Sequence, residues 1–461
     1  MLDLTLGQIV TTVDGCLLQG NPQVRVMGLS TDSRRVQSGE LFIALRGERF
    51  DGHCFLEAVA LAGAAAAVVM ERPVAPPAGL ALILTADTLT ALGAISRAHR
   101  RRFTLPVIGI TGSNGKTTTK DLLASVLERA CPVVKTERNF NNEIGLPLTL
   151  LKINSATAAT VVEMGMRGRG QIRQLARIAL PNIAVVTNVG LTHLELLGTQ
   201  ANIARAKGEL VEELDPAGLA VLNGDDPYVR EMRGLTAARA VFYGIDAPRL
   251  DYRAVAIRLR ETGCEYVAAT PRGELPISLP LPGRHNILNS LAALAVAKEL
   301  GFEDAAVQAG LAFPTLTGKR LHIVEHKGYR IIDDTYNASP TSVRAALEVL
   351  AGATAPGRRI AVLADMLELG PEGPELHRGL GEYAAAVGID WLLGHGELAR
   401  EYVAGFNARQ AGGTGVHYQS KTTLINELQH MAQPGDLILI KGSRDMQMEA
   451  VVAALTNKED E

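Results

Sequence analysis

Cysteine is scarce in this chain, and the residues present are too far apart to form a recognisable motif. They are Cys16, Cys54, Cys131 and Cys264. No pair has the C-x-x-C spacing that is typical of structural zinc sites. A disulfide framework is equally disfavoured, because such scaffolds are short and dense in cysteine. We therefore expect reduced thiols, as is usual for a cytosolic protein.

Long hydrophobic runs and an excess of basic charge are also missing. The longest apolar stretch, residues 58–70, is far shorter than the ~20 residues that a membrane-spanning helix needs. The opening residues MLDLTLGQIV lack the basic and apolar regions of a signal peptide. The net charge of −3 gives no sign of a nucleic-acid binder. We expect a cytoplasmic protein with no nucleic-acid partner and no membrane insertion.

The length and composition indicate a globular protein of several domains. The chain has 461 residues, 47% of them hydrophobic and 21% charged. At ~150 residues per domain, this length predicts about three domains. We divide the chain into residues 1–102, 103–317 and 318–461.

Short apolar runs that alternate with helical segments predict an α/β fold. In the first block they lie at residues 41–45, 66–70 and 80–84, and the block ends in a helix whose basic run, His99–Arg102, we expect to face solvent. In the middle block they lie at residues 106–110, 159–164, 182–190 and 218–226. That alternation is typical of a parallel sheet covered on both faces.

The pattern changes twice after residue 240. Residues 241–245, 252–260, 264–269 and 275–283 resemble antiparallel strands, which we interpret as a side sheet. Residues 329–334, 358–365, 390–394 and 436–443 are strand candidates in the last block and predict a second doubly wound, Rossmann-like unit.

A glycine-rich loop follows the apolar strand PVIGI and precedes the helical segment DLLASVLERA. Its candidate ATP-binding residues are Gly112, Ser113, Asn114, Gly115, Lys116, Thr117 and Thr118. Lys116 would reach the β- and γ-phosphates, and the Thr117 hydroxyl would bind Mg²⁺. The match to G-x-x-x-x-G-K-[ST] is incomplete, because Ile110 stands at the first glycine position. A plain strand-to-helix turn is the alternative, and a phosphate loop alone does not identify the reaction.

The segment TGSNGKTT resembles the form of this loop found in Mur ligases and folylpolyglutamate synthetases. Further segments resemble Mur ligase motifs in the right order along the chain. They are STDSRRVQSGELFIALRGERFDGHCF, NFNNEIGLPLTLL, VVEMGMRGRGQI, TNVGLTHLELLGT with AKGEL, LPGRHNILNSLAALAVA, IIDDTYNASPTSVRAAL and LILIKGSRDMQME. The resemblance covers essentially the whole chain. It implies a small N-terminal α/β domain that binds the UDP part of a substrate, a central P-loop ATPase domain and a C-terminal Rossmann-like domain.

DDTYNASP, ADMLELG and KGSR resemble the branch of the family that uses D-alanyl-D-alanine, and the D-N-P-R motif of the diaminopimelate-adding branch is absent. The resemblance implies ligation of that dipeptide to UDP-N-acetylmuramoyl-tripeptide through an acyl phosphate. The products are UDP-N-acetylmuramoyl-pentapeptide, ADP and phosphate, in peptidoglycan precursor synthesis. We expect ATP, two Mg²⁺ ions and a monomer.

The metal-binding and catalytic residues follow partly from position and partly from the resemblance. Glu163 ends a buried strand pattern, where a carboxylate suits Mg²⁺, although a capping or salt-bridged glutamate is the alternative. The resemblance implies that His193 binds a second Mg²⁺ and that CO₂ carbamylates Lys207 to give a further metal ligand. Asn188 and Asn142 are candidates for positioning the acyl phosphate. By position alone His193 would be a surface or structural residue, and the charged Lys207 on its helix would face solvent.

The remaining candidates are binding residues. For ATP they are Asn286 and Asn289 near adenine, with helix capping as their alternative, Arg320 as a phosphate clamp and Asp334 at the ribose or hinge. For the peptide substrates they are Asn139, Asn141, Asn142, Tyr336, Asn337, Lys441 and Ser443. For uridine diphosphate they are Ser30, Thr31, Asp32, Ser33, Arg34, Arg46 and Gly47, which would otherwise form a polar surface turn.

Other functions stay open at this point. A related amide ligase that adds diaminopimelate or glutamate shares these motifs. A P-loop ATPase that couples hydrolysis to motion is a hypothesis from a different functional class. A degenerate binding module without catalytic activity is a third hypothesis. Retention of the lysines, the histidine and the glutamate named above disfavours the last.

Overall fold

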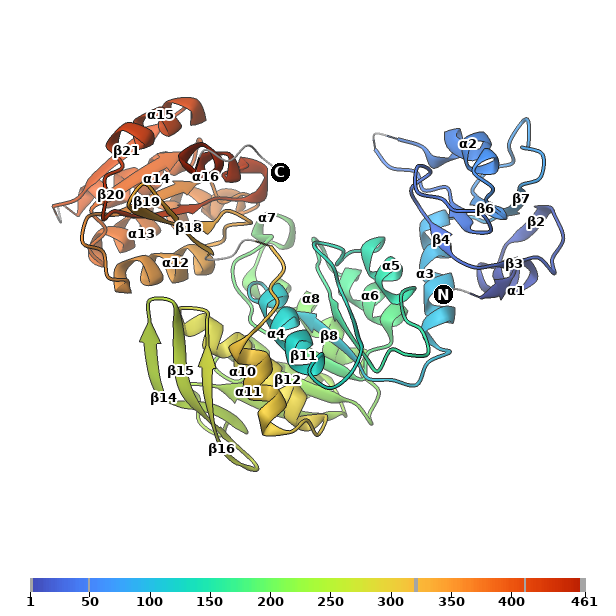
Figure 1. Cartoon of the computed structure of the whole chain (residues 1–461), viewed down its shortest axis with the longest axis horizontal. Helices are drawn as coiled ribbons and strands as arrows, with labels where there is room; N and C mark the ends of the chain where they lie inside the picture. Colours follow the sequence, from blue (N-terminus) through green and yellow to red (C-terminus); the bar gives the residue numbers. More distant parts are fainter. Residues whose placement is uncertain (1–2, 49, 319–321, 410–411, 457–461) are drawn as a thin grey trace.

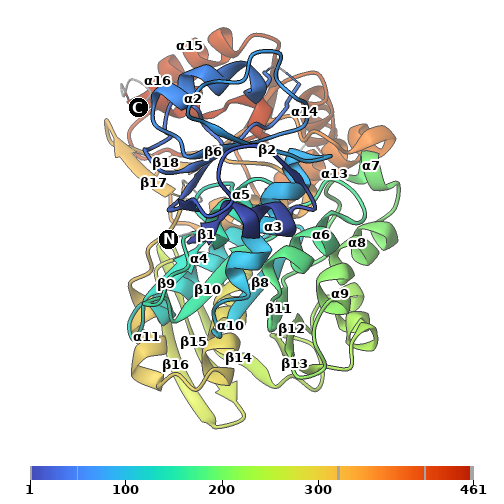
Figure 2. The same cartoon turned by 90° about the vertical axis from the view of Figure 1, so that its right-hand side faces the viewer.

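The computed structural model describes residues 3–48, 50–318, 322–409 and 412–456, and within them the chain forms three α/β domains. The N-terminal and C-terminal domains rise from opposite ends of the central domain (Figure 1). Seen from the side, the N-terminal domain lies in front of the C-terminal one (Figure 2). No helix in the described ranges is long and apolar enough to cross a membrane.

The N-terminal domain is built on a mostly parallel sheet with the strand order β2-β7-β6-β5-β4. Its strands are β2 (Cys16–Gln19), β4 (Leu29–Ser30), β5 (Leu41–Ile43), β6 (Ala66–Val69) and β7 (Ala81–Leu84), with β1 (Leu4–Thr5) and β3 (Arg25–Val26) as a separate antiparallel pair. Its helices are α1 (Leu6–Thr12), α2 (Leu56–Leu61) and α3 (Thr88–Arg100). The three predicted strands of this block are confirmed.

The basic end of α3 is not the solvated helix end that we expected. His99 and Arg100 are buried, and only the residues after them are exposed. His99 Nε2 lies 2.9 Å from the carbonyl of Ile153, and Arg100 Nε donates to the carbonyl of Ala179 over 3.2 Å. These hydrogen bonds connect α3 to the central domain and offset part of the cost of burial, although His99 Nδ1 has no hydrogen-bond partner among the described residues.

The central sheet has the strand order β16-β15-β14-β13-β12-β11-β8-β10-β9. Its parallel part contains β8 (Val107–Thr111), β9 (Val133–Lys135), β10 (Ala159–Glu163), β11 (Ile183–Val186), β12 (Leu219–Asn223) and β13 (Arg239–Gly244). The helices are α4 (Lys116–Leu127), α5 (Gly145–Leu150), α6 (Gln171–Ala179), α7 (Leu194–Leu197), α8 (Gln200–Glu212), α9 (Pro227–Glu231), α10 (Arg284–Glu299) and α11 (Asp304–Ala312).

Successive apolar residues of the central strands point to opposite faces, so the sheet has a core on each side. Ile108 packs in the cluster that contains α4, α10 and α11, whereas its neighbour Val107 packs in the cluster of α5, α6 and α8. This arrangement confirms the predicted parallel sheet covered on both faces.

The predicted side sheet is partly wrong. Strands β14 (Tyr252–Arg260), β15 (Gly263–Thr270) and β16 (Gly273–Leu279) are antiparallel to one another, as expected. Residues 241–245, however, begin within β13, which runs parallel to both β12 and β14. The antiparallel strands therefore extend the central sheet, because β13 connects them to it edge to edge.

The C-terminal domain is a second doubly wound unit with the strand order β17-β18-β22-β19-β20-β21. Its strands are β17 (His322–His326), β18 (Tyr329–Asp334), β19 (Arg359–Ala364), β20 (Trp391–His395), β21 (Thr414–Tyr418) and β22 (Leu437–Lys441). Its helices are α12 (Pro340–Gly352), α13 (Gly373–Ala386), α14 (Ala399–Ala408), α15 (Lys421–Met431) and α16 (Glu449–Thr456). The four predicted strands are present, and β17 and β21 were not predicted.

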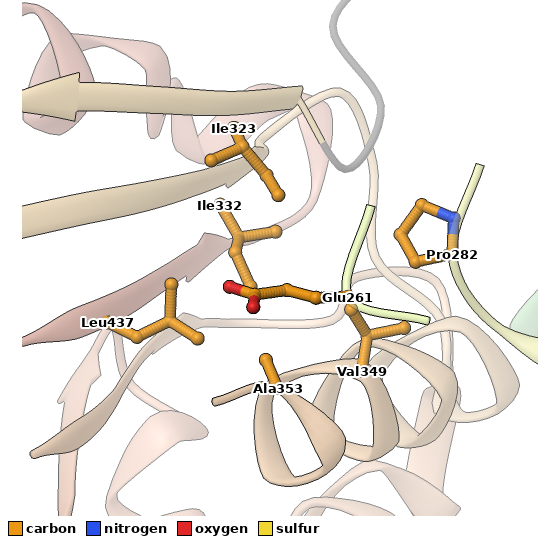
Figure 3. A pocket seen from close by; sticks show the side chains of 7 residues that line it. All are labelled: Glu261, Pro282, Ile323, Ile332, Val349, Ala353 and Leu437. Atoms are coloured by element: carbon orange, nitrogen blue, oxygen red, sulfur yellow. The ribbon is translucent and has the colours of Figure 1, made fainter. Parts of the chain in front are cut away.

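The turn between β14 and β15 reaches the C-terminal domain. Figure 3 shows the carboxylate of Glu261 among apolar side chains of that domain, including Ile323, Ile332 and Leu437. The guanidinium of Arg330 forms an ion pair with this carboxylate. The hairpin thus contacts the C-terminal domain at a point distant in sequence from the connection between the two domains.

Candidate active site

A cleft of about 920 Å³ lies between the central and C-terminal domains. Its lining includes the glycine-rich loop, residues that follow β10 and β11, the start of α10, and loops of the C-terminal domain. The carboxyl ends of parallel strands meet at one edge of a sheet, which is where open α/β sheets bind ligands. The volume is at the upper end of the ~300–1,000 Å³ typical of small-molecule sites.

The glycine-rich loop connects β8 to α4, and residues 112–118 all line the cleft. Gly115 has a φ of 83° and precedes the first residue of α4. A β-carbon on Gly115 would collide with the side-chain oxygen of Asn289 on α10. The loop therefore needs glycine here, and the start of α4 lines the cleft, where the free amide groups of a helix N-terminus suit an anion.

Asn188 shapes this loop from the neighbouring strand. Its Oδ1 accepts a hydrogen bond from the Asn114 N–H over 2.9 Å, and its Nδ2 donates to the Asn114 carbonyl over 3.0 Å. Lys116 Nζ donates to the carbonyl of Gly112 over 2.7 Å. The structure thus places Asn188 behind the loop, where it fixes the loop backbone.

Thr117 and Glu163 meet at the bottom of the cleft. The Thr117 hydroxyl donates to Glu163 Oε2 over 2.7 Å, and Asn141 Nδ2 donates to Oε1 over 2.8 Å. Glu163 is 3% exposed and ends β10, so it is not the capping residue of our alternative. A hydroxyl and a carboxylate beside a phosphate loop are the oxygen donors that suit Mg²⁺.

Lys207 is buried at 2% exposure, which contradicts the solvent-facing position expected from its helix alone. It lines the cleft, and no hydrogen bond or ion pair of its amine is found within the described residues. Burial, with a smaller contribution from Lys116, holds the pKa of this amine well below its usual value. Lys207 is thus a buried amine that loses its proton more easily than an exposed lysine does.

His193 precedes α7 and also lines the cleft. Its Nδ1 lies 2.5 Å from Oε2 of Glu368, a residue of the C-terminal domain. Burial lowers the pKa of His193, opposed by Glu368 and reinforced by Lys207. Among the described residues, no three His, Cys, Asp or Glu side chains gather as a metal site. Protein ligands for a metal here would therefore be few, as in sites completed by phosphate and water.

The start of α10 forms another wall of the cleft. Asn286 Nδ2 donates to the carbonyl of Pro282 over 2.8 Å, and Asn289 Nδ2 donates to Asn286 Oδ1 over 3.1 Å. Neither side chain caps the helix, whose N-cap is Gly283 without a side-chain bond. His285, which the sequence reasoning missed, lines the same wall, and burial lowers its pKa to about 4.

The asparagines expected near the peptide substrate all line the cleft: Asn139, Asn141 and Asn142. Asn142 Oδ1 accepts hydrogen bonds from the N–H groups of Ile144 and Gly145, over 3.3 and 2.9 Å. Its side chain therefore holds the loop that enters α5.

The C-terminal domain contributes Asp334, Tyr336, Asn337, Lys441 and Ser443 to the cleft. Lys441, 2% exposed, donates to Asp334 Oδ2 over 2.5 Å and to the Asn337 carbonyl over 2.8 Å. Ser443 Oγ accepts from the Leu367 N–H over 2.9 Å. Both predicted dipeptide-binding residues thus already have partners within their own domain. Arg320 lies outside the described residues.

The uridine-diphosphate candidates are separate from this cleft and lie at one edge of the N-terminal sheet. Ser30 ends β4 and Arg46 follows β5, its parallel neighbour, so the loops after both strands share that edge. Asp32 pairs with Arg34 at 2.9 Å, and Arg46 pairs with Asp51 at 2.7 Å. The hydrogen bond from Arg34 holds the pKa of Asp32 below its usual value.

Two contacts across the domain boundary were not predicted as site features. Ser339 Oγ donates to Asn114 Oδ1 over 2.9 Å, which joins the start of α12 to the phosphate loop. Glu368 bonds to His193, as described above. The segment ADMLELG had marked the region of Glu368, but a sequence motif does not identify the partner of a side chain in another domain.

Comparisons with known proteins cover the chain from end to end. Residues 25–100 match the model of the Mur ligase family catalytic domain, residues 110–297 that of the Mur ligase middle domain, and residues 319–444 that of the Mur ligase glutamate ligase domain. UDP-N-acetylmuramoyl-tripeptide–D-alanyl-D-alanine ligase of Bacillus subtilis is 38% identical over 461 residues, covering 99% of each chain.

Solved structures agree with the sequence matches. A crystal structure of MurF from Acinetobacter baumannii has a TM-score of 0.91 and 32% identity, covering 99% of both chains. MurF ligase from Thermotoga maritima in complex with ADP has a TM-score of 0.82 and 28% identity, covering 94% of this chain and 98% of that one. Sequence and fold thus agree over the whole length, and the chain belongs to the Mur ligase family, in its MurF group.

Proposed function

We propose that this protein joins D-alanyl-D-alanine to the terminal carboxylate of UDP-N-acetylmuramoyl-tripeptide, with ATP converted to ADP and phosphate. The observation that carries the proposal is the convergence of Lys116, Glu163, His193 and Lys207 in one interdomain cleft. A relative that is 38% identical over 99% of both chains carries the name of this ligase, and a structural relative was solved with ADP.

In the first step, a carboxylate oxygen of the tripeptide attacks the γ-phosphorus of ATP. The bond from that phosphorus to the bridging oxygen breaks, ADP leaves, and an acyl phosphate forms. Both reactants are anions, so the loop amides, the start of α4 and the Lys116 ammonium are needed to offset their repulsion. Asn188 contributes before ATP binds, because it holds the Asn114 backbone in the conformation that receives the phosphates.

In the second step, the neutral amine of the dipeptide attacks the acyl carbon. The bond from carbon to the phosphate oxygen breaks, and the amine proton leaves with the phosphate. Closure around both peptides would keep water from the acyl phosphate. Lys441, Ser443, Tyr336 and Asn337 lie on the C-terminal side of the cleft, where we place the dipeptide.

Thr117 and Glu163 fit a magnesium ion, since both present oxygen atoms next to the phosphate loop. Such an ion, when bound, neutralises charge on the transferred phosphate. The second site needs a change in Lys207, because an unmodified amine does not suit Mg²⁺. We propose that CO₂ carbamylates this buried amine, which must be neutral to react, and that the carbamate and His193 hold the second ion.

The carbamate has a direct test that does not depend on turnover. The protein equilibrated with isotopically labelled bicarbonate should show a carbamate carbon resonance that is lost in Lys207→Ala. The same resonance in both proteins, or its absence from the parent, overturns the carbamate.

The edge of the N-terminal sheet with residues 30–34, 46 and 47 is our proposed uridine-diphosphate site. Its distance from the cleft suits a long substrate, whose UDP end and peptide end would contact different domains. We propose boundaries at 102/103 and 317/318 for these domains, a cytoplasmic location where ATP is available, and a monomer, because one chain lines the whole cleft.

The function is tested by ADP release with UDP-N-acetylmuramoyl-tripeptide, ATP and Mg²⁺, with D-alanyl-D-alanine, diaminopimelate or glutamate as the amine. We expect release with the dipeptide, and a loss of about 10²–10³-fold in Lys116→Ala, which removes a charged donor to the phosphates. Release only with a single amino acid would indicate a related ligase. Release that needs no peptide would indicate an ATPase that couples hydrolysis to motion.

A further inference from the structure

The loop after β19 of the C-terminal domain packs against the start of α7 in the central domain, and Glu368 makes the hydrogen bonds found there among the described residues. Its side chain lies 2.5 Å from His193 Nδ1, and its carbonyl accepts the Glu195 N–H over 3.1 Å. The side chain of Glu368 therefore contacts the N-cap residue of α7, and its backbone contacts the first turn of that helix.

The backbone at this contact is unusual on both sides of the domain boundary. His193 has a φ of 57° and Glu368 a φ of 61°, the left-handed region that non-glycine residues rarely adopt. Residues held in such conformations cluster at functional sites, because the surrounding structure must offset their strain. Here the two meet at one hydrogen bond.

A carboxylate on one ring nitrogen determines what the other nitrogen can do. With Nδ1–H donated to Glu368, the lone pair of Nε2 is the one left for a metal ion. Carboxylates that orient a metal-binding histidine in this way usually strengthen metal binding by about 10–100-fold. The side chain of His193 is 27% exposed and that of Glu368 41%, so neither is held in place by burial alone.

We propose that Glu368 is a positioning residue that orients His193 for the second metal ion only when the C-terminal domain is docked. Closure of the domain would then complete the metal site as well as enclose the substrates. The inference rests on the proposed function, because it uses the second metal site assigned there. The inference adds a residue from the C-terminal domain to that site. Phosphate transfer would then start only after this domain has closed.

The test counts Mn²⁺ ions bound to the full chain with a non-hydrolysable ATP analogue and bicarbonate, without turnover. In the parent we expect a site at Thr117 and Glu163 and a second one at His193. Glu368→Ala should weaken the second about 10–100-fold and leave the first unchanged. Glu368→Gln should restore part of the affinity, because its amide oxygen still accepts from Nδ1–H. Glu372→Ala removes the same charge from an exposed position nearby and should bind as the parent does.

Steady-state kinetics provide a second readout. Glu368→Ala should lower kcat with little change in the KM for ATP, because the first metal and the phosphate loop are intact. If Glu368→Ala binds the second Mn²⁺ as tightly as the parent does, the inference is overturned. A parent that binds one Mn²⁺ overturns it together with the second metal site, whereas dipeptide-dependent ADP release tests the ligase function separately.

Discussion

Two lysines, Lys116 and Lys207, line the same cleft, but their environments give them different properties. Lys116 is partly exposed and hydrogen-bonds to its own loop, as a residue that binds phosphate can. Lys207 is buried, and the charge of Lys116 adds to burial in disfavouring its ammonium form. One lysine is thus suited to act as a cation and the other to react as a neutral amine.

Asn188 allows the phosphate loop to be tested without removing a charge. Asn188→Leu keeps the side-chain size but leaves the Asn114 N–H without its partner, whereas the Asn114 carbonyl keeps the Thr187 hydroxyl; the loss should cost about 1–3 kcal/mol. Because a disordered loop binds phosphate poorly, we expect ADP affinity to fall about tenfold. Calorimetric titration with ADP and urea unfolding measure the two effects.

The matched control for this change is Asn407, which also bonds to both backbone groups of one residue, Gly415, but is exposed and in the C-terminal domain. Asn407→Leu should leave ADP affinity unchanged. Equal ADP affinities in Asn188→Leu and the parent would show that the asparagine does not shape the nucleotide site.

His285 predicts a pH dependence of stability. Burial lowers its pKa to about 4, opposed by Asp334 and reinforced by Lys441, whereas an unfolded histidine titrates near 6.5. Between those values the unfolded state binds a proton that the folded state does not, so the free energy of unfolding falls as the pH falls. From pH 7 to pH 5 the loss from this residue is at most about 2 kcal/mol, since part of its ring is accessible from the cleft.

His285→Gln removes that contribution, so urea unfolding at pH 5 and pH 7 should show a smaller loss of stability than in the parent. The exposed His430 provides the control, since His430→Gln should keep the parent's pH dependence. The same loss in all three proteins would refute the assignment.

At the scale of elements, the contact between the phosphate loop and α10 determines how α4 begins. Gly115→Ala places a β-carbon against Asn289 and imposes a φ of 83° on a residue that disfavours it, at a cost of about 1–3 kcal/mol. Because the loop must move away from α10, we expect the ADP affinity of the folded variant to fall as well as its stability. Gly388→Ala is the control, with a φ of 80° and open space around the β-carbon. If both variants bind ADP like the parent, the contact does not shape the site.

Buried elements were the predictable ones. The short apolar runs of β8, β10, β11 and β12 predicted a parallel sheet, because both faces of each strand are buried. The edge strands β17 and β21 were missed, since HIVEH and TGVHY mix polar and apolar residues. The direction of residues 241–245 was wrong because local sequence does not encode which neighbour a strand pairs with.

The site residues at strand ends could be predicted from the sequence, whereas those that depend on contacts between helices or between domains could not. Residues 112–118 and Glu163 lie at strand ends, so the order of motifs already placed them together. The burial of Lys207 depends on what packs over its helix, and the partner of His193 comes from another domain. Both features follow from tertiary contacts that a linear pattern does not contain.

At the scale of the whole molecule, the described residues of the C-terminal domain contact the central domain both at the cleft, through Glu368 and Ser339, and away from it. Besides Glu368, the β14–β15 turn places Glu261 beside Arg330 (Figure 3). Apart from this ion pair, Glu261 Oε1 has no hydrogen-bond partner in the described ranges. A carboxylate that lies among apolar side chains depends strongly on its one cation, so the ion pair should bias the domain toward this docked position.

Glu261→Ala should therefore release the C-terminal domain in the nucleotide-free protein. The two side chains are 27% and 22% exposed, which places the pair between surface and buried cases and its loss at about 1–2 kcal/mol. That energy shifts the docked population about 5–30-fold, which small-angle X-ray scattering would record as a larger radius of gyration. Arg260→Ala on the same hairpin breaks an exposed pair with Glu265 and should leave the scattering unchanged. A Glu261→Ala profile identical to the parent's would mean that Glu368 and the cleft contacts hold the domain without the hairpin.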